Sequence, residues 1–374
     1  MESAGCPTGH LPDDLLVLIL ARLPVKALFR CRSVCRFFCN LPSDPHFARL
    51  HHRMSRGDET VMVDLREPLG RTHSTLACVD ASGGLSELSL RFLNDRVRVR
   101  ASCNGLLCCA SVPSYGVYYV CNPVTREFRP LPRTRETPPN RYHPDDEATL
   151  VGLAFDPSES DGEFSVVLAG YYRPFGHRPF DRLVCLIYNS KMNAWRRFLS
   201  TWFDEFSRMN RNQVVFAGGS LHWLTRSCSY VLVLDLGDEV WRKISLPGEI
   251  ASGAFGASRV YLLEFEGAVS VVQMSEAWMC TWVLEDYERE KWVLVDRLHL
   301  RCIMGFVPSA FPVSQTRDAV FMATQSKIFV YDRKSKVWKE IFAVKDTDIS
   351  YPLWFSAQPF RSTLLSFNQG LQLY

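Results

Sequence analysis

The chain has 374 residues, of which 47% are hydrophobic and 12% aromatic, enough to fill the core of a large domain beside a smaller one. Its 43 basic and 40 acidic residues leave a formal net charge of +3, which excludes the long-range field typical of proteins that bind nucleic acids or membrane surfaces. Partner recognition is therefore expected to depend on local surfaces.

Cysteine usage and the absence of export signals predict a reducing compartment. The 13 cysteines are odd in number and scattered, no cleavable signal is visible at the start, and no Asn-x-Ser/Thr glycan acceptor occurs. We therefore expect the protein in the cytoplasm and/or the nucleus. The most apolar stretch, residues 15–21, is much shorter than the about 20 residues of a membrane-spanning helix, so no membrane contact is expected.

The first fifty residues predict a group of short helices. An apolar run over residues 15–23 follows Asp13, which is expected to cap the first helix, and Pro24 limits its continuation. Residues 15–20 are all apolar and cover every side of this helix, which therefore needs burial all round. Three further helices are expected over residues 24–31, 34–41 and 44–54.

A helical segment of about 45 residues rarely completes a core without a metal, a disulfide or a partner. We therefore expect a second protein to complete it. One alternative is that the first helix is buried against the C-terminal domain. Another is a zinc site, drawn from Cys31, Cys35 and Cys39 with His46, His51 or His52. The spacer between the cysteines and the histidines is too short for a zinc finger, so core packing of the cysteines is favoured.

Four stretches of this segment recur together in a known family. They read LPDDLL at 11–16, ILARLP at 19–24, LFRCRSVCRFF at 28–38 and DPHF at 44–47, an order and spacing that resembles an F-box. The resemblance implies binding to the Skp-type adaptor of a cullin-RING ubiquitin ligase. The residues that it implies as adaptor-facing are Leu11, Pro12, Leu15, Pro24 and Leu28. Those that it assigns to packing of the module are Ile19, Leu23, Val34 and Phe38.

Beyond about residue 58, short apolar or aromatic strands alternate with Gly, Pro, Asn and Asp turns, which predicts an all-β domain. One unit recurs: a strand ends in Asn or Asp, and an aromatic residue stands six positions later. The pairs are Asn122 with Phe128, Asn189 with Trp195, Asp235 with Trp241, Asp286 with Trp292, and Asp332 with Trp338. The aromatic residues are 67, 46, 51 and 46 positions apart, and three of these intervals fit a kelch-like period of about 50.

This repeat predicts a β-propeller. An Asn or Asp that begins a hairpin turn, with an aromatic residue that packs against the next sheet, explains the fixed spacing. A single blade would expose an apolar face, so the blades must stack and the ring must close. With an early blade over residues 61–90 and closing strands over 353–365, about six blades are expected. Five or seven blades, a β-sandwich or two smaller β domains are the alternatives.

Further stretches resemble the F-box-associated, kelch-like domains of plant F-box proteins. They are SCNGLLC at 102–108, YYVCNPVTREFRPLP at 118–132, and VGLAFDP at 151–157 before FSVV at 164–167. The two resemblances span nearly the whole chain and imply a multidomain protein. Its parts are a disordered N-terminus (1–9), an F-box helical module (10–54), a short linker (55–58) and a kelch-like propeller (59–374).

No catalytic, cofactor or metal site is expected. The acidic residues at 145–147 and 285–286 lie in predicted loops, where charges are usually solvated. His143 and His177 lie in Pro-rich loops without a nucleophile in a recognisable local motif. The nearly balanced charge also disfavours binding of nucleic acid.

Target recognition is expected on loops at one rim of the ring. Residues 133–146 and 171–181 are long, rich in Pro, Arg and aromatic residues, and lie inside the expanded 67-residue interval. Tyr, Phe and Arg are residue types that anchor interfaces. The candidate target-binding residues are therefore Tyr142, Tyr172, Phe175, Arg178 and Phe180. The alternative is that these loops only cover a core.

The chain is thus interpreted as the substrate-recognition subunit of a Skp-cullin-F-box ubiquitin ligase. The F-box is expected to dock on the adaptor, and through it on the cullin and RING subunits, while the propeller holds a target protein for ubiquitination and degradation. The chain itself is expected to perform no covalent chemistry and to need no cofactor. The alternatives are an F-box scaffold or sequestering factor not coupled to degradation, and a propeller enzyme with an adventitious helical start.

Overall fold

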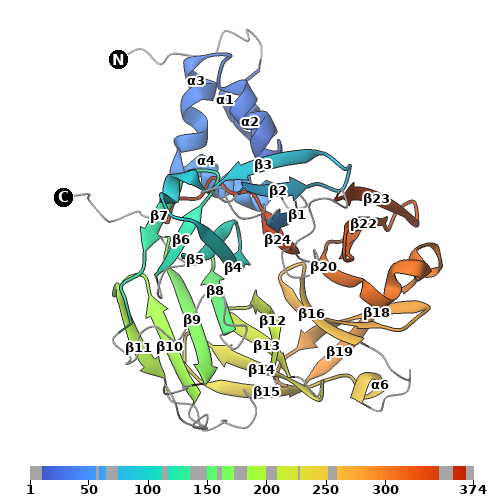
Figure 1. Cartoon of the computed structure of the whole chain (residues 1–374). Coiled ribbons are helices and arrows are strands. Elements are labelled where there is room, and N and C mark those ends of the chain that lie inside the picture. Colours follow the sequence, from blue (N-terminus) through green and yellow to red (C-terminus); the bar gives the residue numbers. More distant parts are fainter. Residues whose placement is uncertain are drawn as a thin grey trace.

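The computed structural model contains a small helical body attached to one side of a ring of β-sheets (Figure 1). It describes residues 11–55, 59–64, 75–111, 117–134, 150–157, 162–171, 183–198, 209–225, 228–251, 259–344 and 357–367. The predicted disordered stretch 1–9 and most of the predicted linker 55–58 lie outside these ranges, so the domain boundaries stay predictions.

The helical module, which we define as residues 11–55, contains the helices that the sequence predicts. They are α1 (Asp13–Leu20), α2 (Val25–Cys31), α3 (Arg36–Asn40), the 3-10 helix η1 (Leu41–Ser43) and α4 (Pro45–Met54). Asp44 caps α4, because its Oδ1 accepts a hydrogen bond from the N–H of Phe47 at 2.8 Å. The expected cap at Asp13 is wrong: Pro12 precedes α1 without a side-chain cap, and Asp13 lies in the first turn.

The described strands form six antiparallel sheets of four strands each, which we call blades 1 to 6. Blade 1 contains β24 (Ala357–Arg361), β1 (Glu59–Asp64), β2 (Thr75–Val79) and β3 (Leu85–Ser89). Blade 2 contains β4 (Val97–Cys103), β5 (Leu106–Ser111), β6 (Tyr118–Asn122) and β7 (Glu127–Pro130). Blade 3 contains β8 (Leu150–Phe155), β9 (Phe164–Tyr171), β10 (Leu183–Asn189) and β11 (Ala194–Phe198).

The second half of the ring repeats this pattern. Blade 4 contains β12 (Met209–Ala217), β13 (Ser220–Thr225), β14 (Tyr230–Asp235) and β15 (Trp241–Ser245). Blade 5 contains β16 (Arg259–Phe265), β17 (Ala268–Met274), β18 (Trp278–Asp286) and β19 (Lys291–His299). Blade 6 contains β20 (Phe311–Gln315), β21 (Ala319–Ala323), β22 (Lys327–Asp332) and β23 (Val337–Ala343). Short helices η2 (Arg91–Leu93), α6 (Gly248–Ala251) and η3 (Arg301–Ser309) lie between strands.

The ring closes because its first sheet is built from both ends of the chain. β24 pairs antiparallel with β1, in a register that places Glu59 opposite Arg361 and Val63 opposite Ala357. The innermost strands β24, β4, β8, β12, β16 and β20 each contact the next around the ring. The expected fold, a helical module followed by a propeller of about six blades closed by strands near residues 353–365, is confirmed.

The repeat that predicts the propeller has one structural basis in all five places. Each Asn or Asp accepts hydrogen bonds from the backbone N–H groups two and three residues later, at 2.8–3.4 Å. The residue four positions after it has a positive φ, between 48° and 63°; these residues are Arg126, Asn193, Glu239, Glu290 and Lys336. The turn thus fixes the hairpin between the third and outer strands of its blade.

The fixed spacing from the Asn or Asp to the tryptophan also has a structural cause. The indole N–H of Trp292 donates to the carbonyl oxygen of Ser245 at 2.7 Å, which joins blade 5 to blade 4. Trp195 makes the same kind of bond to Pro132 at 2.6 Å and Trp338 to His299 at 3.3 Å. The expected packing against a neighbouring sheet is therefore found, but these bonds reach the preceding blade in chain order, not the next one.

The apolar core lies between the blades. Separate buried clusters occupy the gaps between successive blades, and the gap between blades 3 and 4 holds Trp223 and Trp241, whose ring centroids are 5.4 Å apart. The cluster between blades 2 and 3 extends further, because it also contains residues of the helical module and of the segment after β24. Removal of this apolar surface from water is the main force that holds the ring and the module together.

The strand order assigns the loops of the ring to two rims. Antiparallel neighbours place the first-to-second and third-to-fourth connections of each blade on one rim, and the second-to-third and blade-to-blade connections on the other. We call the first the turn rim, because the five Asn or Asp turns lie there, and the second the loop rim. β24 ends and β1 begins at the turn rim, so the helical module joins the ring on that side.

Candidate interaction surfaces

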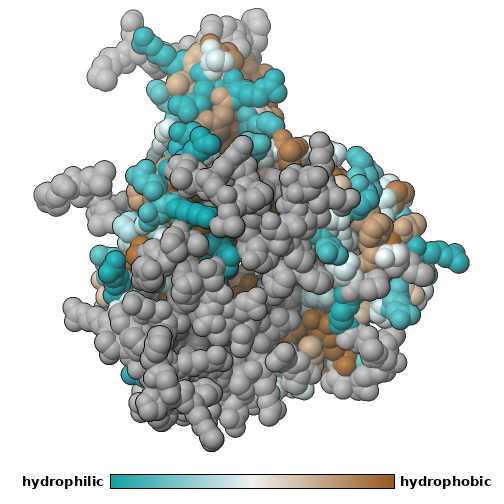
Figure 2. Space-filling model, in the orientation of Figure 1, coloured by the Kyte–Doolittle hydropathy of each residue, from teal (hydrophilic) through white to brown (hydrophobic). Residues whose placement is uncertain are grey.

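The helical module carries several exposed apolar side chains. Leu15 and Ile19 are each 50% exposed, and their spacing of four residues places them on one face of α1. Leu11 before the helix is 44% exposed, and Val34 between α2 and α3 is 67% exposed. We call these four residues the apolar module surface. Figure 2 shows brown atoms among teal ones on the helical module.

The opposite side of the module is buried against the ring. Leu20 at the end of α1 and Val25 and Leu28 of α2 belong to the same buried cluster as Leu364 and Leu365, which follow the last strand. The expectation of burial all round is therefore met on one side only. The alternative drawn from the sequence, burial of the first helix against the C-terminal domain, does not hold for Leu15 and Ile19, which stay exposed.

The residues that the F-box resemblance assigns to the adaptor differ in their exposure. Leu11, Pro12, Leu15 and Pro24 are exposed, whereas Leu28 is 2% exposed and packs inside the module. The assignment of module packing is also divided. Leu23 and Phe38 are half-buried, as expected, but Ile19 and Val34 are exposed. The spacing of four residues between Leu15 and Ile19 is the sequence signal that could have grouped them on one face.

Of the module's candidate metal ligands, His51 is buried, His46 is exposed, and Cys31, Cys35 and Cys39 are half-buried. His51 is 1% exposed, and its Nε2 lies 2.9 Å from the carbonyl oxygen of Leu23. Its ring lies 6.1 Å from that of Phe47. Over the described residues, no group of three or more His, Cys, Asp or Glu side chains is placed to hold a metal ion. No helix within the described ranges is long and apolar enough to cross a membrane.

The candidate target-binding residues Tyr142, Tyr172, Phe175, Arg178 and Phe180 lie outside the described residues and stay predictions. The strands that bound their two loops are nevertheless described. One loop joins the end of β7 to the start of β8, and the other joins β9 to β10. Both connections therefore start and end on the loop rim, opposite the helical module.

The described part of the loop rim contributes three aromatic residues with a cation over each ring. The Arg297 guanidinium lies 4.5 Å from the ring of Trp278, which is 36% exposed. The same pattern pairs Lys243 with Tyr230 at 4.7 Å, and Lys327 with Phe306 at 5.4 Å. Sequence reasoning missed these pairs, because each joins residues 13 to 21 positions apart. The third strand of each blade begins on the loop rim, and three such strands begin at Tyr230, Trp278 and Lys327.

The acidic pair Glu285 and Asp286 has structural partners. Glu285 Oε2 lies 2.5 Å from Nζ of Lys291, and Asp286 accepts the two backbone hydrogen bonds of its turn. Burial raises the pKa of the Cys103, Cys108 and Cys185 thiols to about 12, so these groups stay protonated and unreactive at neutral pH. The other acidic run, at 145–147, and the two loop histidines, His143 and His177, lie outside the described residues.

A helical module that leaves apolar side chains uncovered is thus fixed to the turn rim of a closed six-bladed propeller. Residues 9–50 match the F-box domain family, and residues 72–348 match the family described as the F-box associated beta propeller domain. The chain belongs to the F-box proteins that carry this F-box-associated propeller.

Similar proteins occur in Arabidopsis thaliana. The F-box protein At5g49610 is 52% identical over 358 residues, which cover 96% of this chain and 98% of that protein. The F-box protein CPR1 is 24% identical over 371 residues, which cover 91% of this chain and 86% of that protein. The F-box/kelch-repeat protein At3g23880 is 23% identical over 294 residues, which cover 74% of this chain and 76% of that protein.

Proposed function

We propose that this chain is the substrate-recognition subunit of a Skp-cullin-F-box ubiquitin ligase. The F-box docks on a Skp-type adaptor, and the cullin and RING subunits join through that adaptor. The propeller holds a target protein whose ubiquitination leads to degradation. The chain works in the cytoplasm and/or the nucleus, and its role is orientation, since a bound target is modified by proximity to the ubiquitin-loaded enzyme.

The apolar module surface is the observation that carries this proposal. Its four residues, Leu11, Leu15, Ile19 and Val34, are exposed although full burial of one Leu, Ile or Val side chain is worth about 1.5–3 kcal/mol. A partner that covers them recovers this free energy, and F-box domains in general bind Skp-type adaptors. Pro12 precedes α1 and Pro24 precedes α2, and both are proposed to complete the contact, whereas Leu28 supports it from beneath.

The proposed target surface is the loop rim. Tyr142, Tyr172, Phe175, Arg178 and Phe180 are proposed to contribute from the two long loops. The described aromatic and cationic pairs are proposed to extend this surface across blades 4 to 6, and Trp278 and Phe306 are exposed there. Aromatic and Arg residues supply most of the binding free energy in many interfaces.

The adaptor contact is tested by isothermal titration of a Skp-type adaptor into the full chain and two variants. Leu15→Asp with Ile19→Asp places two charges in the proposed contact, and we expect the affinity to fall at least tenfold. The control is Met192→Asp, since Met192 is 71% exposed in the turn between β10 and β11 of blade 3, outside the helical module. Unchanged affinity in the double variant would refute the assignment of this surface.

The degradation role is tested in cells by following proteins captured by proximity labelling of the full chain. Candidate targets are those still captured by a variant with the Leu15→Asp and Ile19→Asp changes, because that variant keeps the propeller. Depletion of the chain is expected to lengthen the half-life of such a target. A half-life that stays the same for every captured protein would instead favour the scaffold or sequestering role.

A further inference from the structure

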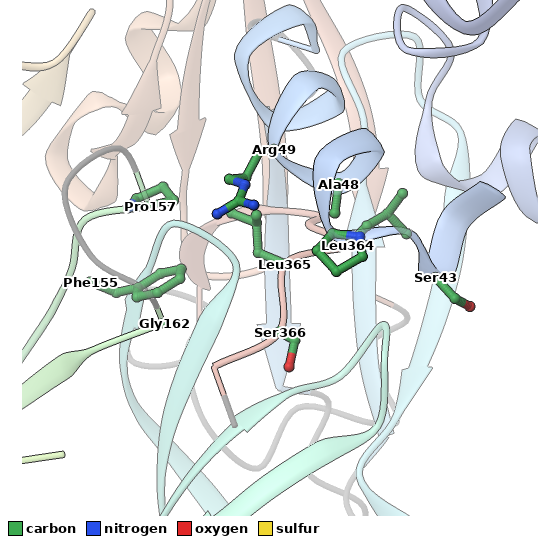
Figure 3. A pocket seen from close by; sticks show the side chains of 10 residues that line it. Ser43, Ala48, Arg49, Phe155, Pro157, Gly162, Leu364, Leu365 and Ser366 are labelled. Carbon is green, nitrogen blue, oxygen red and sulfur yellow. The ribbon is translucent and has the colours of Figure 1, made fainter. Parts of the chain in front are cut away.

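The residues that follow the last strand lie between blade 2, blade 3 and the helical module. Residues 362–367 continue from β24 on the turn rim, and Leu364, Leu365 and Phe367 are buried. Blade 2 and blade 3 lie on one side of them and α4 of the helical module on the other, as Figure 3 shows for Ala48, Leu364 and Leu365. We call residues 361–367 the C-terminal clamp.

Blade 2 binds the clamp through the side chain of Asn122. Its Nδ2 donates to the carbonyl oxygens of Thr363 at 3.1 Å and Leu365 at 2.9 Å, and the side chain is fully buried. Gly105 has a φ of +88°, and any side chain there would collide with Thr363. The ring surface is thus shaped for close approach of the clamp backbone.

The end of the clamp is held between blades 2 and 3. The ring of Phe367 packs edge-on against that of Phe164, with centroids 5.5 Å apart, and the N–H of Phe367 donates to Oε2 of Glu127 at 3.3 Å. Gly162, with a φ of +86°, again leaves room only for the passing backbone of Phe367. These contacts join the clamp to both blades.

The other side of the clamp touches the helical module. The Arg361 guanidinium donates to the carbonyl oxygen of His52 in α4. Leu364 and Leu365 share one buried cluster with Leu28 and Phe47. Ala48 and Arg49 of α4 line a small hollow together with Leu364, Leu365 and Ser366 (Figure 3). The module therefore rests on the clamp as well as on the ring.

We propose that the C-terminal clamp fixes the orientation of the helical module on the propeller, and that Asn122 is its positioning residue. This inference rests on the proposed function in one respect: the fixed orientation would set the distance between the adaptor surface and a target on the opposite rim. A clamp that loosens lets the module move relative to the ring, and ubiquitin transfer then loses its fixed geometry.

Asn122 offers a substitution that separates two roles. Its Oδ1 accepts the turn hydrogen bonds from Val124 at 2.9 Å and Thr125 at 3.4 Å, while its Nδ2 holds the clamp. In Asn122→Asp, one carboxylate oxygen can keep the turn, as Asp does in blades 4 to 6, but the other faces two carbonyl oxygens. Asn189→Asp is the matched control, because Asn189 holds the equivalent turn of blade 3 through Lys191 and Met192.

The test is hydrogen–deuterium exchange of the full chain, with the amides of α4 and of residues 361–367 as the readout. We expect Asn122→Asp to speed exchange of both segments at least tenfold and to leave the strands of blades 4 and 5 unchanged. Asn189→Asp should leave α4 at the wild-type rate. If Asn122→Asp does not fold, a chain that ends at Thr363 keeps β24 and removes most of the clamp, and should show the same fast exchange in α4. Wild-type exchange of α4 in either clamp variant would overturn the proposal.

Adaptor titration keeps this result separate from the proposed function. Loss of α4 protection with unchanged adaptor affinity supports the clamp and leaves the F-box surface intact. Failure of the wild-type chain to bind an adaptor would refute the proposed function, yet the exchange difference between Asn122→Asp and Asn189→Asp would still support the clamp. Equal exchange in those two variants, together with normal adaptor binding, would refute the clamp alone.

Discussion

The propeller and the helical module use their apolar residues in opposite ways. In the ring, the last strand completes the first sheet, and residues such as Phe360 in β24 are buried between blades, at 2% exposure. In the module, Leu15 of α1 remains 50% exposed. The ring thus pairs its first and last strands with each other, whereas the module keeps apolar side chains exposed. The two parts are therefore stabilised by different means: the ring by closure of its first sheet, and the module by attachment to the ring.

The strongest test of this contrast is the substitution Phe360→Ala at the closing seam. Because the side chain is buried in the core between blades 1 and 2, we expect a loss of about 3–5 kcal/mol in the free energy of unfolding. Chemical denaturation followed by tryptophan fluorescence measures it. A loss below about 1 kcal/mol would contradict a ring that depends on its closing strand.

A second test uses Glu59, which begins β1 at the same seam. Burial, and then the charge of Glu264, raise the pKa of this carboxyl from 4.5 to about 7, while its hydrogen bond from Ser314 opposes the shift. A raised pKa in the folded state means that the stability associated with the protonated group is complete below pH 4.5 and is lost as the pH rises through about 7.

We therefore expect Glu59→Gln to be more stable than the wild-type chain by about 3 kcal/mol above pH 7, with the difference vanishing below pH 4.5. Thermal unfolding across this pH range measures the difference. The opposite sign, with the variant less stable at high pH, would show that the charged form of Glu59 is the one that the seam prefers.

A smaller effect is expected at a polar contact between blades 4 and 5. Burial lowers the pKa of His222 to about 4, so the ring is neutral at pH 7. Its Nδ1 faces the carbonyl oxygen of Val215 at 3.2 Å and therefore carries the proton, which leaves Nε2 to accept from the Tyr287 hydroxyl at 3.0 Å.

Tyr287→Phe removes that donor, and we expect a loss of about 1–2 kcal/mol in unfolding free energy at pH 7. Denaturant titration of the two proteins side by side gives the value, and equal midpoints would show that the contact adds nothing to the ring.

The smallest effect on stability is expected on the apolar module surface. Leu15→Ser alters an exposed side chain, so the free energy of unfolding should stay within about 0.5 kcal/mol of the wild-type value, while adaptor affinity falls. Calorimetry of the free chain and titration with the adaptor provide the two numbers. A large loss of stability in the free chain would show that Leu15 supports the module itself and would remove the contrast with Phe360.

Local chemistry explains which features were predictable from the sequence. An Asn or Asp that binds the N–H groups two and three positions later, followed by an aromatic residue that reaches a neighbouring blade, leaves a fixed spacing in the sequence. That spacing predicted five of the blades, and the β pattern at the two ends supplied the sixth. The four helices were equally predictable from the sequence, because Asp44 and the prolines mark where they begin or end.

Features that depend on distant segments were not predictable. The division between buried Leu28 and exposed Ile19 follows from packing of the module on the ring and on residues near 364, more than 300 positions away. The second role of Asn122 is also hidden, because its partners Thr363 and Leu365 lie 241 and 243 positions further along the chain. Its sequence context shows only the turn.

The pairing of β24 with β1 has a consequence for the order of events during synthesis. The helical module leaves the ribosome before the ring does, whereas the strand that closes the ring and the clamp leave it after all the other strands. A nascent or prematurely terminated chain therefore exposes both the apolar module surface and an open first sheet. Chaperones retain such partly folded chains, and proteases remove them. Closure of the ring and seating of the helical module therefore both depend on the last described residues, up to Phe367.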